Sequence, residues 1–201
     1  MKNIDLKKIK KAMEKTLDSK RYEHTLGVEY TAAALAMRYG ESIENARLAG
    51  LLHDCAKCMS DEKRLSFCKK HNIAINSIER KNPSLLHAKV GSFLAMEEYH
   101  VKDSDVINAI LNHTTGRPGM SLLEKIVFVA DYIEPGRKQA PSLNEKRRLA
   151  FIDLDKAFLW ILKDTLEYLQ KDKDNIDPMT ARTYEYYCRE EDALEDENNN
   201  L

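Results

Sequence analysis

Five polar side chains occur where the surrounding pattern predicts the apolar face of a helix. His24 lies four residues before Val28, and Asp131 lies four residues after Val127 in the most apolar segment of the chain. Spacings of three, four and seven residues place side chains on one side of a helix. The five residues are His24, His53, His87, His113 and Asp131, and a sixth, Asp54, directly follows His53.

The chemistry open to such a set is metal-dependent. Buried imidazoles and carboxylates are costly unless they are paired or bound to a metal. Histidine and carboxylate together suit iron, manganese, zinc or nickel, whereas calcium prefers oxygen ligands alone. For any single histidine, a satisfied core position is the ordinary interpretation. Because four of the six histidines share the pattern with two aspartates on five predicted helices, we predict that they meet at a metal centre.

The elements that would bring these residues together are helices. With 7 glycines and 5 prolines in 201 residues, the chain has few turn-formers, which favours long helices over a many-stranded sheet. Ser84 is expected to cap its helix, and Ser121 with Glu124 has the form of a capping box. The periodicity predicts an all-α fold. Single helices are expected over about 6–17, 20–39, 43–55, 61–71, 84–99, from 104 and over 121–133, a longer pair of helices across 142–170, and a last helix from 178.

Length and charge describe one domain with an acidic end. We place a single domain at residues 1–189, because 201 residues fit one domain. Residues 190–201 hold six acids and no lysine or arginine, and we predict a solvated, disordered tail there. Without that tail, 32 basic residues face 27 acidic ones. Such a mildly basic body suits an anionic ligand but lacks the basic stripe expected of a nucleic-acid-binding protein.

The sequence also predicts a cytoplasmic protein without a membrane segment. Its apolar runs are only a handful of residues long, as in Ile126–Ala130, far shorter than the roughly 20 residues that cross a bilayer, and the first residues lack the apolar stretch of a signal peptide. The four cysteines, Cys55, Cys58, Cys68 and Cys188, are expected to be reduced. Cys55 and Cys58 form a C-x-x-C pair, but no second pair completes a zinc site and no strand precedes it.

Three longer strings surround the candidate ligands: Arg21–Val28, Ala49–Lys57 and Ala130–Arg137. With Leu86–Ala88 and Asn112–Gly116 between them, they resemble the HD-domain metal-dependent phosphohydrolases and, within that superfamily, its YqeK branch. The match covers about residues 17–140, with a looser echo at Asp177–Arg182. Cys55 departs from the branch, in which an aromatic residue is expected after the His-Asp pair. The resemblance implies a helical bundle with a metal centre between helices.

The same resemblance implies an activity and a set of ligands. The branch hydrolyses diadenosine tetraphosphate symmetrically to two ADP, using iron. By this resemblance His24, His53, Asp54 and Asp131 bind one or two ions, iron first, with manganese, nickel or zinc as alternatives. His87 and His113 occupy places where some HD proteins hold a second metal, and in this branch they resemble substrate contacts. Thr180 and Arg182 fall in the loosely matching stretch that contacts the nucleotide.

Hydrolysis of a phosphoanhydride needs a nucleophile at neutral pH and neutralisation of phosphoryl charge, both of which a metal and its bound water can supply. We assign catalysis to His24, Asp54 and Asp131, with Asp54 both a ligand and the acceptor that orients the attacking water. The expected phosphate contacts are the cations Arg21, Lys57 and Arg137, the hydroxyl of Thr114 and the two histidines His87 and His113. For the three cations, solvated surface charge is the alternative interpretation.

Other functions remain open from the sequence. The same metal site would serve a nucleoside-monophosphate or deoxynucleotide phosphatase, because the pocket decides the substrate. A nucleotide-binding regulatory module with little turnover and an iron oxygenase on the same scaffold are further alternatives. The apolar segment Ile152–Leu169 fits core packing, and part of it fits a homodimer face.

Overall fold

The computed structural model describes residues 5–169 and 177–199, together with the side chains of most of them. Within these ranges every regular element is helical, which confirms the predicted all-α class. The elements are α1 (Leu6–Thr16), α2 (Ser19–Tyr39), α3 (Ile43–Leu52), α4 (Asp61–Lys70), α5 (Ser77–Lys81), the short 3₁₀ helix η1 (Pro83–Leu86), α6 (His87–Glu97), α7 (Ser104–Asn112), α8 (Leu122–Ile133), α9 (Leu143–Ala150), α10 (Leu154–Leu169) and α11 (Pro178–Asn199).

Local sequence sets most helix ends. The side chains of Asp18, Ser42 and Asp103 each accept a backbone N–H at the start of a helix, which satisfies donors that the helix itself leaves free. Ser121 and Glu124 form the predicted capping box of α8. Gly40 ends α2 in the left-handed conformation, with φ of 77°, which glycine adopts without steric cost.

Two helix ends differ from the prediction. The helix expected to reach residue 55 ends at Leu52, so His53 is its C-cap and Asp54 lies in the following turn. The predicted cap Ser84 is wrong: it lies inside η1, its hydroxyl donates to the Asn82 side chain, and α6 starts at His87 without a side-chain cap. Pro83 explains this start, because proline fits the first turn of η1 and cannot continue a preceding helix.

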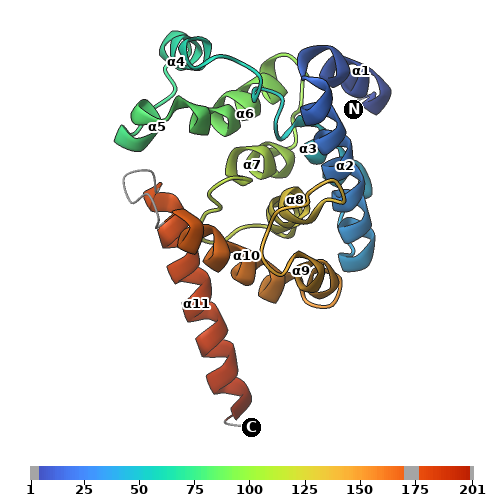
Figure 1. The fold of residues 1–201 in the computed structure, drawn as a ribbon, viewed down its shortest axis with the longest axis vertical. Coiled ribbons are helices and arrows are strands. Elements are labelled where there is room, and N and C mark those ends of the chain that lie inside the picture. The colour runs from blue at the N-terminus through green and yellow to red at the C-terminus, as the bar shows by residue number, and fades with distance from the viewer. Residues whose placement is uncertain (1–4, 170–176, 200–201) are drawn as a thin grey trace.

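The core lies between α2, α3, α7 and α8 (Figure 1). Helix α8 has buried apolar residues on several sides, including Ile126, Val127 and Val129, as expected for a helix surrounded by others. Helices α2 and α3 approach so closely that a Cβ at Gly50 would lie 2.9 Å from the Cα of Glu29. Glycine at this position therefore sets the separation of the helices that carry His24 and His53.

Two groups of helices flank this core. Helices α4, η1 and α6 enclose a small second cluster of buried residues, Ala56, Cys68, Leu86 and Val90. On the other side, α10 packs against α8, α9 and α11. Buried residues of α10 such as Phe158, Ile161 and Leu162 belong to the core, which confirms the core-packing interpretation of this apolar segment for those residues.

Helix α11 extends away from the body of the molecule (Figure 1). The disordered tail from residue 190 stays a prediction, and in the described part of that segment α11 continues to Asn199. The physical reason is composition, because glutamate, alanine and leucine are good helix formers and neither glycine nor proline interrupts residues 190–199. In the described part of the chain, no helix combines the length and apolarity that a bilayer crossing requires.

Candidate metal centre

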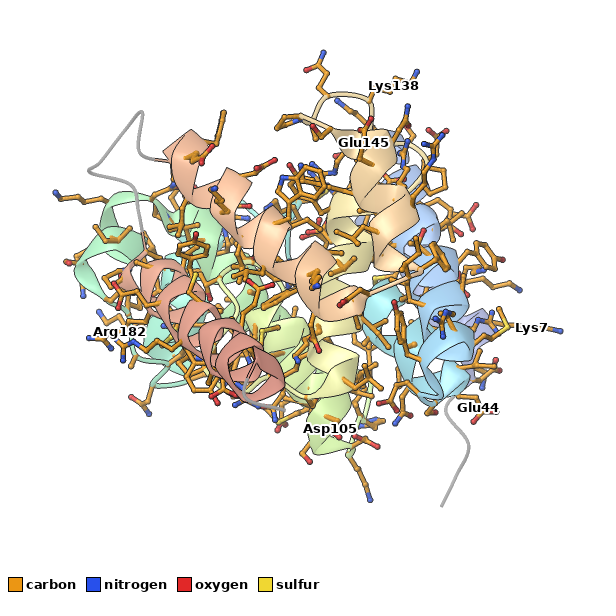
Figure 2. All side chains as sticks on the ribbon, turned by 90° about the horizontal axis from the view of Figure 1, so that it is seen from below. Lys7, Glu44, Asp105, Lys138, Glu145 and Arg182 are labelled. Atoms are coloured by element: carbon orange, nitrogen blue, oxygen red, sulfur yellow. The ribbon has the colours of Figure 1, made fainter. Side chains whose placement is uncertain are left out.

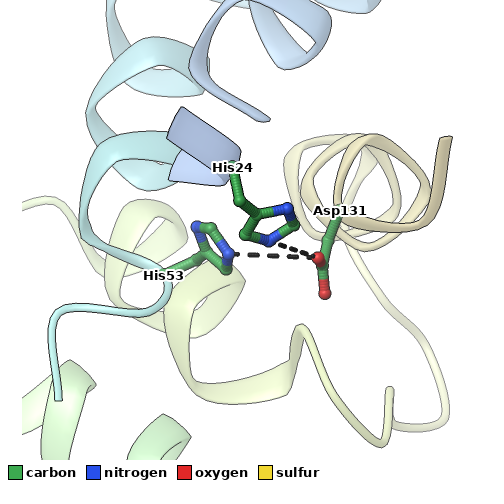
Figure 3. Close-up of side chains that lie close together, drawn as sticks. All are labelled: His24, His53 and Asp131. Atoms are coloured by element: carbon green, nitrogen blue, oxygen red, sulfur yellow. Dashed lines mark ion pairs between the residues drawn. The ribbon is translucent and has the colours of Figure 1, made fainter. Parts of the chain in front are cut away.

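Three side chains from three helices point toward one another (Figure 3). His24 comes from the second turn of α2, His53 from the end of α3, and Asp131 from the last turn of α8. The His24 Nε2 atom lies 3.0 Å from Asp131 Oδ1, and His53 Nε2 lies 4.0 Å from the same oxygen. Close packing of α2, α3 and α8 therefore brings together residues that are more than one hundred positions apart.

Asp54 joins this group to a second pair of histidines. Its Oδ2 atom lies 3.5 Å from His53 Nε2 and 3.9 Å from His24 Nε2. Its Oδ1 atom lies 3.2 Å from His87 Nε2 and 3.7 Å from His113 Nε2. The carboxylate thus stands between two sets of imidazoles, and the early end of α3 is what allows it to do so. All six residues singled out in the sequence meet here.

The hydrogen bonds of the Nδ1 atoms decide which ring nitrogen is free. Nδ1 of His53, His87 and His113 lies 2.7, 2.6 and 2.7 Å from a backbone carbonyl oxygen three residues earlier in the chain. A carbonyl oxygen only accepts, so Nδ1 carries the hydrogen in the neutral ring and Nε2 keeps its lone pair. These three histidines all present Nε2 to the centre.

The donor atoms of the cluster fit a divalent transition metal. His24 Nε2, His53 Nε2 and Asp54 Oδ1 are buried and have no hydrogen-bond partner among the described residues. Buried polar atoms left unpaired are expensive, and an imidazole nitrogen and a carboxylate oxygen are both ordinary ligands for such an ion. Two overlapping triads have their donor atoms within 4.8 Å of one another: His24, His53 and Asp131, and His53, Asp54 and His113.

Charge in the cluster is set by its own members. Burial disfavours the ionised form of Asp54, but the neighbouring histidines, His53 foremost, outweigh it and hold its pKa well below the usual value. The pKa of Asp131 is lowered too, since contacts with His24 and His53 overcome burial. Burial lowers the pKa of His87 to about 4. At neutral pH Asp54 and Asp131 are therefore carboxylates and His87 is a neutral imidazole.

The predicted phosphate-binding groups surround this cluster. The Arg21 guanidinium lies 2.7 Å from Asp54 Oδ2, and Lys57 Nζ lies 3.3 Å from His87 Nε2. Arg137 Nη2 donates to the Asp131 carbonyl at 2.9 Å and lies 3.3 Å from Asp131 Oδ1. The Thr114 hydroxyl lies 3.3 Å from His113 Nε2. Arg21 and Arg137 are about one-third exposed, so each combines a contact with the cluster and access to solvent.

In the described part of the chain, Thr180 and Arg182 form no hydrogen bond or ion pair with the cluster. Thr180 is buried in the first turn of α11, where its N–H donates to the Asp177 carbonyl. Arg182 is exposed on α11 (Figure 2). Across residues 5–169 and 177–199, no hydrogen bond or ion pair connects either one to the histidines and aspartates of the centre. A role for them in nucleotide binding stays a prediction.

Sequence reasoning missed Glu134, which is buried at the C-cap of α8. Its Oε1 atom lies 3.1 Å from His24 Nδ1. The available signal was its position three residues after Asp131, on the side of α8 that faces the centre. The C-x-x-C pair lies beside the site without joining it: Cys55 is buried, with its thiol donating to the Gly91 carbonyl, and Cys58 is exposed.

A helical bundle that gathers histidines and aspartates from several helices at one candidate metal centre is the architecture of the HD-type hydrolases. The HD domain family model matches residues 21–136. The chain belongs to the HD-domain family.

Curated relatives and a solved structure resemble the chain over most of its length. A symmetrical bis(5'-nucleosyl)-tetraphosphatase of Bacillus subtilis is 40% identical over 174 residues, covering 87% of this chain and 92% of the relative. Its counterpart in Halalkalibacterium halodurans is 42% identical, covering 84% and 89%. A crystal structure of a predicted HD superfamily hydrolase involved in NAD metabolism, from Clostridium acetobutylicum, matches with a TM-score of 0.88 and 40% identity, covering 92% of this chain and 98% of that one.

Proposed function

We propose that the protein is a metal-dependent hydrolase that cleaves diadenosine tetraphosphate symmetrically to two ADP. The observation that carries the proposal is the convergence of His24, His53, Asp54 and Asp131 on one centre. Two relatives that carry the name of this activity, and that align over more than four-fifths of the chain, support it. Net addition of one water between the second and third phosphates gives two ADP.

The four residues of the centre would hold a divalent metal, and iron is the ion that we propose first. When bound, such an ion supplies an acidified water and a Lewis acid for phosphoryl oxygens. Both carboxylate oxygens of Asp54 face the centre. Asp54 would therefore accept a hydrogen bond from the attacking water and orient the lone pair of that water toward phosphorus. Arg21, Lys57 and Arg137 would neutralise the charge of the bridging phosphates.

The second cluster supports a further cation position. His87 Nε2 and His113 Nε2 lie 3.1 Å apart, and both face Asp54 Oδ1. With Nδ1 protonated in each ring, three electron-pair donors face one another, an arrangement that a positive charge would stabilise. Lys57 Nζ, at 3.3 Å from His87 Nε2, supplies one such charge. We propose that a second metal takes the rest of this place, or that His87 and His113, each protonated at Nε2 as well, donate hydrogen bonds to a phosphate oxygen there.

The first test is anaerobic incubation of iron-loaded protein with diadenosine tetraphosphate, followed by ion-exchange separation of the nucleotides. We expect two ADP per substrate. The Asp54→Asn variant should be inactive. The matched control is Asp105→Asn, which should stay active because Asp105 is an exposed acid at the start of α7. ATP plus AMP would overturn the symmetrical assignment. Absence of any product from metal-loaded protein would overturn the proposal and direct the search to nucleotidase and binding-module activities.

We also propose that the protein works as a homodimer in the cytoplasm. All four cysteines are free thiols, which suits a reducing compartment. Because Phe158, Ile161 and Leu162 are buried in the core, a dimer face on this side would use the exposed Phe151 and Ile152 instead. Light scattering of the wild type and of Ile152→Glu measures this: a monomeric wild type would contradict it.

A further inference from the structure

Glu134 is a buried carboxylate without a cationic side chain to balance it. It is 3% exposed, and in the described part of the chain no lysine or arginine forms an ion pair with its carboxylate. Arg147 binds the carbonyl of Glu134 instead. Burial of an unbalanced carboxylate is costly, so other interactions must compensate for the burial of Glu134.

The two carboxylate oxygens of Glu134 have separate partners. Oε1 lies 3.1 Å from His24 Nδ1, and Oε2 accepts the backbone N–H of Gly136. A carboxylate has two acceptor oxygens and no hydrogen, so it accepts from both groups at once. An amide of the same size has one acceptor only. The site therefore requires an acid here, and glutamine cannot satisfy both contacts.

Two glycines leave the space that this carboxylate fills. A Cβ atom at Gly27 would lie 2.5 Å from Glu134 Oε2, and one at Gly136 would lie 2.9 Å from the same oxygen. Gly27 follows His24 by three residues on α2, so both share one face of that helix. A side chain at either glycine would push the carboxylate out of its position against His24.

The position of His24 in its helix explains why it needs an external partner. His53 and His113 lie at helix C-termini, where backbone carbonyls are free to accept from Nδ1. At His87, the Ser84 carbonyl in the 3₁₀ turn accepts both the backbone N–H and Nδ1 of the same residue. His24 lies inside α2, where helical hydrogen bonds already occupy the carbonyls one turn back. Glu134 supplies the acceptor that the backbone of α2 does not.

We infer that Glu134 is a positioning residue for the metal centre, which holds His24 as the Nδ1-protonated tautomer with Nε2 directed at the ion, in a slot kept open by Gly27 and Gly136. The inference rests on the proposed function in one respect, that His24 is a metal ligand. Carboxylate partners of ligating histidines commonly act in this way, and their removal costs about ten- to hundredfold in metal affinity.

The test measures metal affinity, by chelator competition or by the visible absorption of bound Co²⁺, together with urea unfolding of the metal-free protein. We expect Glu134→Gln to bind metal about ten- to hundredfold more weakly, and Glu134→Asp to recover part of the loss. Glu124→Gln is the matched control, because Glu124 is also a buried, hydrogen-bonded acid of α8 but contacts Arg117 and Asn112. It should leave metal affinity unchanged.

The Gly27→Ala variant distinguishes a positioning role of Glu134 from an effect on the stability of the metal-free protein. Helix propensity alone predicts that alanine stabilises α2 at this position, whereas its methyl group would displace Glu134. We expect weaker metal binding without a loss of metal-free stability. Because the two changes remove one contact, the Gly27→Ala/Glu134→Gln double variant should bind metal no more weakly than the weaker single variant.

The outcomes distinguish this inference from the proposed function. Wild-type affinity in both Glu134→Gln and Gly27→Ala would overturn the role of Glu134 and leave the metal centre intact. Unchanged metal affinity in His24→Ala would instead overturn the assignment of His24 as a ligand. Should Glu134→Gln fail to fold, Gly27→Ala alone decides.

Discussion

Each histidine of the centre has one ring nitrogen directed at the centre and the other held by the protein. The Nδ1 atoms of the histidines are held by carbonyl oxygens or by Glu134, so the Nε2 atoms cannot exchange roles with them. Asp54 uses both its oxygens within the centre. Such fixed orientation keeps the donor atoms in place before any ion or substrate arrives, which is what catalysis by positioned groups requires.

Arg137 is expected to act on substrate rather than on the metal. It contacts Asp131 mainly through the backbone carbonyl at 2.9 Å and remains about one-third exposed. Removing one charged hydrogen bond to a phosphate costs roughly 1.5–3 kcal/mol, so Arg137→Ala should lower kcat/KM about ten- to hundredfold while metal content holds. Steady-state kinetics with metal analysis checks this, and Lys138→Ala, an exposed neighbour (Figure 2), serves as control. Loss of metal in Arg137→Ala would show a structural role instead.

His87 should make the metal-free protein sensitive to acid. Burial lowers its pKa to about 4, below the value of about 6.5 in an unfolded chain. Between these values the unfolded state binds a proton that the folded state does not, so stability falls as pH drops, by roughly 3 kcal/mol in total. His24, whose pKa is raised by Asp131 and Glu134 in spite of burial, acts in the opposite direction. Asp54 and Asp131, with lowered pKa values, lose their contribution only at more acidic pH.

The measurement is urea unfolding in the presence of chelator from pH 7 to pH 4. His87→Gln should lose less stability over this range than the wild type does. His100→Gln is the control, since His100 is exposed and its loss should leave the slope unchanged. Equal slopes for the wild type and His87→Gln would contradict the prediction.

At the scale of elements, what the sequence predicts well is local. The capping box of Ser121 and Glu124 and the stop at Gly40 depend on residues within one turn, and the structure confirms them. Tertiary contacts could not be predicted in this way. The Glu134–His24 contact, for example, joins residues that are 110 positions apart in the sequence. The end of α3 was also missed, because His53 keeps helical backbone angles (φ of −53°, ψ of −40°) and only the hydrogen-bonding pattern changes. Six site residues were predictable because polar residues on apolar faces are visible in the chain itself.

Gly50 fixes how closely α2 and α3 approach, and a larger residue should disturb the centre. Alanine would gain about 1 kcal/mol in helix propensity, but its Cβ would meet the backbone of Glu29 at 2.9 Å and that of Val28 at 3.3 Å. Backbone atoms cannot move aside, and overpacking costs about 1–3 kcal/mol. We expect Gly50→Ala to lower the free energy of unfolding and to weaken metal binding, because α3 carries His53.

Urea unfolding and chelator competition measure both effects of Gly50→Ala. Gly40→Ala is the control: open space surrounds this glycine, but its φ of 77° is unfavourable for alanine. It should cost about 1 kcal/mol and leave metal affinity unchanged. Wild-type stability and metal affinity in Gly50→Ala would show that α2 and α3 can separate without consequence.

At the scale of the whole molecule, α2, α3 and α8, which carry His24, His53 and Asp131, pack within the bundle, while α11 projects from it (Figure 1). The contacts that hold α11 are near its start: Asp177 accepts from Asn76, and the Tyr187 hydroxyl accepts the N–H of Met120 at 2.7 Å. The Tyr187 ring also packs against Phe158, with ring centres 5.0 Å apart. Stability and activity should therefore depend on the first half of α11.

Deleting residues 190–201 should leave metal content, kcat and melting temperature close to those of the full chain. The deletion also changes the net charge from −1 to +5, since it removes six acids and no base. A more positive body attracts an anionic substrate more strongly at low ionic strength, so KM should fall at low salt and return to the full-chain value as salt screens the charge. Tyr187→Phe is the contrasting variant, expected to cost about 1 kcal/mol through its lost hydrogen bond. A fall in kcat on truncation that persists at high salt would show that the acidic end takes part in the site.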